Sequence, residues 1–192
     1  MQKSVFVKFA SLAIAGVLSQ GAFAADGTIN FTGEITDAPC SVSANSQNMT
    51  VPLGKVSRNV FGITAPGTTP AVTAATVGKK SIPANFTIDL LGCGATAKGA
   101  SVSFSGTADL DNTTTLRVAN AGQAGTAAAS GVAIEIADSA GAKIDLNTGK
   151  SIDYPLGLGD NSLKFQAAYI ATKPAVTVGP ANSTAQFTIA YK

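Results

Sequence analysis

Short runs in which apolar and polar residues alternate dominate this sequence of 192 residues. A period of two places successive side chains on opposite faces of a β-strand, so each run predicts a strand with one buried face. The positions on that face are Ile29, Phe31, Gly33 and Ile35; Phe86, Ile88 and Leu90; Val102 and Phe104; Val132, Ile134 and Ile136; Leu163, Phe165, Ala167 and Tyr169; and Ala185, Phe187, Ile189 and Tyr191. Polar turns separate the runs and no helical period lies between them, which predicts an all-β sandwich.

Two long stretches carry no alternation. Residues 57–80 are rich in Thr, Ala, Gly and Pro, and we interpret them as a long surface connection that contains a short helical turn. Residues 119–130 are a second loop of small residues. Neither has the character of a domain linker, and the chain shows no repeat at solenoid periods, so we predict one domain.

The first 24 residues have the pattern of a secretory signal peptide. Lys3 and Lys8 form a basic start, residues 9–18 are apolar, and Ala22-Phe23-Ala24 has the small-x-small form of a cleavage site. A membrane anchor is the alternative, but a spanning helix needs about 20 apolar residues. We therefore predict cleavage after Ala24, export, and no membrane span in the mature chain.

The charges of the chain do not favour nucleic acid as a partner. The chain has 13 basic and 11 acidic residues, and two of the basic ones, Lys3 and Lys8, lie in the predicted signal peptide. The remainder is balanced and has no basic cluster of the kind that binds phosphates. Cys40 and Cys93 both lie in the exported part, where an even pair of cysteines indicates a disulfide. A metal pair or a reactive thiol is the alternative.

The sequence offers little chemistry for catalysis. It has no histidine, no G-x-S-x-G motif and no convincing general base. Asp109 and Asp111 lie in a predicted turn, where aspartate commonly bonds its own backbone, and the turn has too few oxygen ligands for a calcium loop. We predict neither an enzyme nor a cofactor or metal site.

The two ends of the mature chain carry the most information. A strand pattern begins almost at once at residues 25–36, and the chain ends inside another, with Tyr191 next to last. The chain resembles the major pilins of the chaperone–usher pathway, the subunits of type 1 and P-like fimbriae of Gram-negative bacteria. The resemblance rests on the signal peptide, residues 28–35, 37–40, 86–93, 131–136, 165–169 and 185–192, and on Tyr191 with Gly179 fourteenth from the end.

This resemblance implies an incomplete immunoglobulin-like sandwich, residues 37–192, that lacks its final strand. Residues 25–36 would be a donor strand that completes a neighbouring copy by donor-strand exchange, a known form of strand addition in pilins. Its inserted positions would be Gly27, Ile29, Phe31, Gly33 and Ile35, with Gly33 over a shallow part of the groove. The acceptor groove would run along the C-terminal strand, at Gly179, Ala185, Phe187, Ile189 and Tyr191.

The expected partners are other copies of the chain and related pilins, a periplasmic chaperone that fills the groove before assembly, and an outer-membrane usher. The subunit would pass through the periplasm to a fimbria on the cell surface and support adhesion. A minor adaptor or anchor subunit is an alternative within the family. A receptor-binding tip subunit fits less well because such subunits carry an extra lectin domain and lack the donor strand, and a periplasmic enzyme lacks a candidate site.

Overall fold

The computed structural model describes residues 29–192 except 31, 34, 36–37, 65–72 and 126. The chain forms two units, Met1–Thr36 and Asp37–Lys192. In the first unit, the described residues 29, 30, 32, 33 and 35 belong to no helix or strand. The predicted signal peptide lies outside the described residues.

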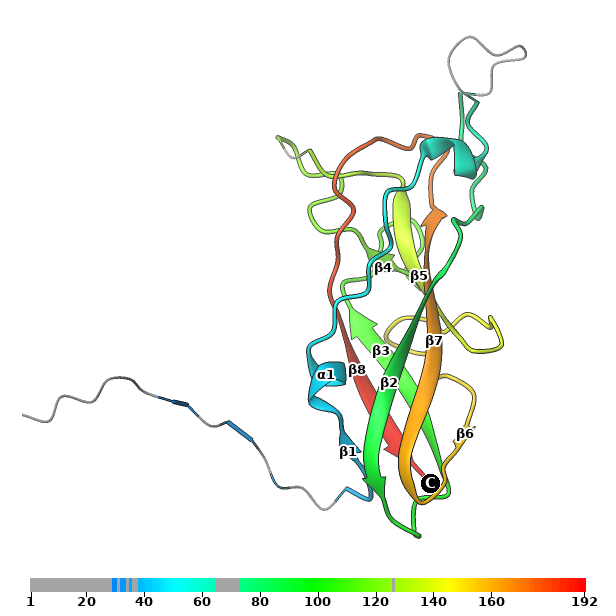
Figure 1. Ribbon diagram of the computed structural model, residues 1–192. Coiled ribbons are helices and arrows are strands. Elements are labelled where there is room, and N and C mark those ends of the chain that lie inside the picture. Colours follow the sequence, from blue (N-terminus) through cyan, green and yellow to red (C-terminus); the bar gives the residue numbers. More distant parts are fainter. Residues whose placement is uncertain (1–28, 31, 34, 36–37, 65–72, 126) are drawn as a thin grey trace, which may run out of the picture. The chain divides into compact units, whose positions relative to one another are not determined.

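The second unit is built mainly from antiparallel strands (Figure 1). In chain order its elements are β1 (Ser41–Val42), α1 (Ala44–Gln47), the 3₁₀ helix η1 (Arg58–Phe61), β2 (Ala84–Cys93), β3 (Gly99–Gly106), β4 (Leu116–Arg117), β5 (Val132–Asp138), β6 (Tyr154–Pro155), β7 (Gly159–Ala171) and β8 (Ala185–Tyr191). The long strands coincide with the alternating runs of the sequence, and the short β1, β4 and β6 carry no such pattern.

The described strands form two sheets, one with the order β1-β2-β7-β5-β4 and one with the order β6-β3-β8. β7 is central in the larger sheet and pairs antiparallel with β2 and β5. In the smaller sheet β8 pairs with β3 from Ala185↔Gly106 to Tyr191↔Ala100. The predicted all-β sandwich is confirmed.

The main core lies between the two sheets and contains a cluster of aromatic rings. Phe165 on β7 has its ring centroid 5.3 Å from that of Phe104 on β3 and 5.5 Å from that of Phe86 on β2. Ile88, Val102 and Leu163 are fully buried around them. Burial of side chains of this size contributes about 1.5–3 kcal/mol each, so the alternating faces supply most of the stability of the sandwich.

A second, smaller core lies at the end of the sandwich near η1. It contains Phe61, Ile63 and Ala75, packed with Val132 and Val176 among others. The interpretation of residues 57–80 as a surface connection is therefore wrong for these three side chains. The predicted helical turn in this stretch is present as η1.

The disulfide between Cys40 and Cys93 is present, with Cα atoms 4.2 Å apart. It links the start of the domain to the end of β2 across 53 positions of sequence. A cross-link over a loop of this length stabilises the folded state by about 4 kcal/mol on the chain-entropy account. No helix among the described residues is long and apolar enough to cross a membrane.

Candidate strand-acceptor groove

The outer side of β8 is an open sheet edge. The carbonyl of Val102 on β3 accepts a hydrogen bond of 2.8 Å from the amide of Ser151, on the side of β3 away from β8. Val102 lies opposite Ile189. Opposite residues in an antiparallel pair exchange both backbone bonds or neither, so the backbone groups of Ile189 point away from β3. Gly99 and Lys192 do exchange both bonds, at 2.8 and 3.2 Å.

The same alternation applies along the whole of β8. The N–H and C=O groups of four residues face the open edge: Ala185, Phe187, Ile189 and Tyr191. Among the described residues these groups have no backbone hydrogen-bond partner. An edge with free donors and acceptors is a template for pairing with another strand.

The side chains of these four residues point to the core but are only half-buried, whereas Gln186, Thr188 and Ala190 are exposed. An inward face that stays half-buried lacks a neighbour on one side. The strand therefore presents both unpaired backbone and uncovered apolar surface along the same edge.

A second wall faces this edge across the sandwich opening. Residues 49–56 run extended between α1 and η1 (Figure 1) and make no backbone hydrogen bond to any described residue. Met49 and Leu53 in this segment pack against the main core. This wall has a short alternation of its own, in which the half-buried Met49, Val51 and Leu53 are separated by exposed residues. The signal is weak because the run is short and contains a proline, which is rare in paired strands.

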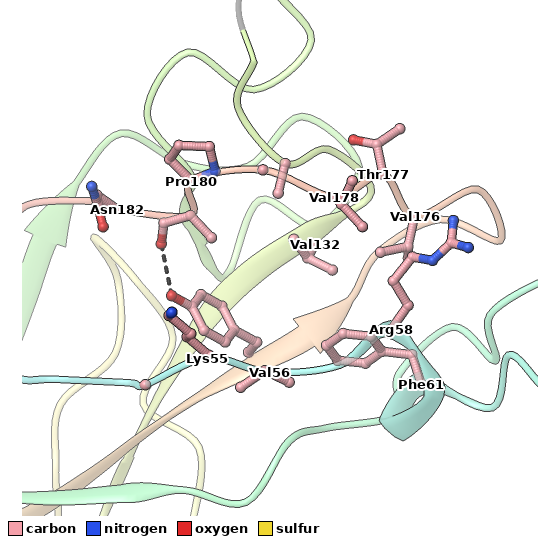
Figure 2. A pocket seen from close by; sticks show the side chains of 15 residues that line it. Lys55, Val56, Arg58, Phe61, Val132, Val176, Thr177, Val178, Pro180 and Asn182 are labelled. Carbon is pink, nitrogen blue, oxygen red and sulfur yellow. Dashed lines mark hydrogen bonds between the residues drawn. The ribbon is translucent and has the colours of Figure 1, made fainter. Parts of the chain in front are cut away.

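Two cavities lie between the walls. The larger, of about 550 Å³, has a floor made by core side chains of both sheets, Phe86, Ile88, Phe104, Leu116, Ile134 and Ile136. The smaller, of about 390 Å³, is shown in Figure 2 and is lined by Phe61, Val132 and Val176 of the second core. Together they form a groove with an apolar floor along the segment that leads into β8.

Tyr169 lines both cavities and stands where they meet. Its hydroxyl donates a hydrogen bond of 2.9 Å to the carbonyl of Ala181, in the segment that leads into β8, and Figure 2 draws this bond as a dashed line. Burial raises the pKa of the Tyr169 phenol above its ordinary value, which favours the neutral form that can donate this bond. The ring thus divides the groove into two compartments.

The structure brings together only part of the predicted groove residues. Gly179, Ala185 and Phe187 line the cavities. Ile189 and Tyr191 share their strand face but lie outside the cavity lining, and the Tyr191 hydroxyl is 3.5 Å from the carbonyl oxygen of Cys40. Burial also raises the pKa of Tyr191.

Of the predicted donor positions, Gly27 and Phe31 lie outside the described residues. Ile29 and Ile35 are 77% and 102% exposed, which is unusual for isoleucine. A Cβ added at Gly33 would meet no atom within 4 Å.

Among the described residues, the groove lining contains no acidic side chain, and its charged side chains are Lys55 and Arg58. Among the described residues there is no group of three metal-ligating side chains. The arrangement offers hydrogen bonds along one edge and apolar surface beneath it. An immunoglobulin-like sandwich with such an open edge is a domain able to accept a β-strand.

Comparison with known proteins assigns the family. Residues 29–192 match the fimbrial protein family, and the chain belongs to it. It is 41% identical to long polar fimbria protein A of Salmonella typhimurium, over 100% of this chain and 98% of that protein. It is 39% identical to a probable major fimbrial subunit of Escherichia coli O157:H7, again over 100% and 98%. A chain from the structure of a chaperone–usher pilus shares the fold, with a TM-score of 0.64 and 23% identity over 88% of this chain and 96% of that one.

Proposed function

We propose that this chain is a structural subunit of an adhesive fimbria, which polymerises when residues 25–36 of one copy insert into the groove of the next. The observation that carries the proposal is the open edge of β8 above an uncovered apolar floor. The chain also carries, at its other end, an alternating segment whose described isoleucines are exposed. The groove lacks a paired strand and an apolar cover, and the alternating segment of another copy can supply both.

The backbone of an inserted strand would pair with the free groups of Ala185, Phe187, Ile189 and Tyr191. Each such hydrogen bond contributes about 0.5–1.5 kcal/mol. Burial of Ile29, Phe31 and Ile35 adds about 5–9 kcal/mol as an upper value. This is enough for a stable non-covalent link between subunits.

The order of side chains in the donor segment fits the order of compartments in the groove. Phe31 and Ile29 would occupy the larger cavity, Gly33 would pass over the ring of Tyr169, and Ile35 would fill the smaller cavity. Glycine within a strand commonly marks close approach of another group. In this register, the ring of Tyr169 lies beneath Gly33 and makes the groove shallow at that position.

A head-to-tail contact of this kind uses different surfaces on the two copies, so its repetition gives an open filament. Before assembly, the open edge and the apolar floor would promote aggregation. A periplasmic chaperone would therefore be needed to cover the groove, and an outer-membrane usher would exchange the chaperone for the next subunit. We place residues 1–24 as a signal peptide removed on export and the mature subunit at the cell surface.

The test changes only the inward face of the donor segment. The donor-deficient chain, with Ile29→Ser, Phe31→Ser and Ile35→Ser, should be exported with its domain folded but should yield no filaments by electron microscopy. The matched control, with Thr28→Ser, Asn30→Ser and Thr32→Ser, changes the outward face and should polymerise normally. Normal filaments from the donor-deficient chain, with mass spectrometry showing it as their main component, would refute the proposal.

A further inference from the structure

The smaller cavity of the groove has a positively charged rim. Lys55 and Arg58 line it beside the apolar Phe61, Val132 and Val176 (Figure 2). Both cations are exposed. In the part of the chain that the structure describes, neither forms an ion pair and no acidic side chain lines either cavity. We call Lys55 and Arg58 the cationic rim.

The segment proposed to enter the groove has the opposite charge. Residues 25–37 contain Asp26, Glu34 and Asp37 and no lysine or arginine. Within an inserted strand, Glu34 would point to the face opposite Gly33 and Ile35, toward the rim and solvent and away from the floor. A carboxylate on that face can reach a cation at the groove edge without being buried.

The shape of the groove decides which carboxylate meets the rim. The smaller cavity has the volume and apolar lining for a branched side chain, which Ile35 has and Gly27 lacks. With Gly33 over Tyr169 and Ile35 in this cavity, Glu34 lies beside the cationic rim. Asp26 is eight positions away, about 27 Å along an extended strand, and is out of reach of the rim.

We propose that the cationic rim of Lys55 and Arg58 attracts Glu34 of the incoming copy, speeds its insertion and sets its register. The inference rests on the proposed function and names the partner residue that the rim recognises. Exposed charges of opposite sign act mainly on the association rate, and salt screens them over about 10 Å at 0.1 M. The rim should therefore matter for the speed and direction of entry more than for final stability.

The experiment measures the rate at which a fluorescent peptide of residues 25–37 associates with the donor-deficient chain. Lys55→Glu with Arg58→Glu in that chain should slow association about tenfold at low salt, and the difference should vanish near 1 M salt, where the screening length is about 3 Å. A peptide with Glu34→Lys should restore the rate on the reversed rim. A peptide with Asp26→Lys should not.

The matched control reverses two exposed lysines outside the groove, Lys150→Glu and Lys164→Glu, and should leave the rate unchanged. The milder Lys55→Gln with Arg58→Gln should give an intermediate rate if full reversal disturbs folding. Equal association rates at low salt for wild-type and altered rims, or rescue by Asp26→Lys in place of Glu34→Lys, would overturn the inference. Neither result would contradict the proposed insertion of the strand. Absence of peptide binding to the unaltered groove would instead count against the proposed function.

Discussion

The hydroxyl of Tyr169 on β7 donates a hydrogen bond of 2.9 Å to the carbonyl of Ala181, which precedes β8. This bond holds the ring between the two cavities of the groove and so fixes where the groove is shallow. The ring is the structural partner that we propose for Gly33 of an incoming donor strand.

Gly33→Leu should therefore slow or block insertion, because the added side chain would meet the Tyr169 ring. Combining Gly33→Leu in the donor with Tyr169→Ala in the acceptor should recover insertion at least in part, since truncation of the ring joins the two cavities. Thr32→Leu places the same side chain on the outward face and should insert normally. The readout is the rate of filament growth, and no recovery in the combined variants would contradict the proposed register.

The strands of the sandwich could be predicted because their pattern is local. The alternation at Phe86–Leu90 or Leu163–Tyr169 indicates a strand with one buried face. Burial of these faces in a shared core brings the strands together. The second wall of the groove is harder to predict, because its alternation spans only Met49 to Leu53 and is interrupted by Pro52. Residues 49–56 have no strand partner among the described residues, and Leu53 shows its role through packing against the core. The hydrogen bond of Tyr169 likewise depends on two segments that only the fold brings together.

The resemblance to pilins singles out Gly179, fourteenth from the end of the chain, and the structure gives a steric reason for a glycine there. Its φ is +153°, and a Cβ built there would lie 1.9 Å from the carbonyl oxygen of Ala127. Gly179→Ala should lower the free energy of unfolding by about 2–4 kcal/mol, because backbone must move to relieve the clash. Urea unfolding measures the loss. Gly157→Ala, where the nearest atom lies 3.9 Å away, is the control and should change stability little.

Stability should fall at alkaline pH, in part through Tyr169. Burial raises the pKa of this phenol above the ordinary value of 10.0. The contribution of the neutral phenol to the free energy of unfolding is therefore complete below about pH 10 and is lost as the pH rises through the raised pKa. The phenolate also cannot donate to Ala181. Tyr169→Phe should therefore lose less stability than the wild type between about pH 9 and pH 11, as followed by urea unfolding. Lysine titration contributes equally to both chains, so equal losses would mean that Tyr169 is not the group responsible.

The alternation of backbone directions along β8 predicts which of its amides an inserted strand protects. The N–H groups of Phe187 and Ile189 face the open edge, whereas that of Thr188 faces β3. In the donor-deficient chain the first two should exchange with deuterium quickly and Thr188 slowly, because exchange requires an amide free of its hydrogen bond. Adding the peptide of residues 25–37 should slow exchange at Phe187 and Ile189 by at least about fivefold, since a formed ladder bond is worth about 1 kcal/mol or more and insertion also excludes water. Thr188 serves as the internal control. Protection of Phe187 and Ile189 that is already complete without peptide would show that the edge of β8 is closed, and with it the groove.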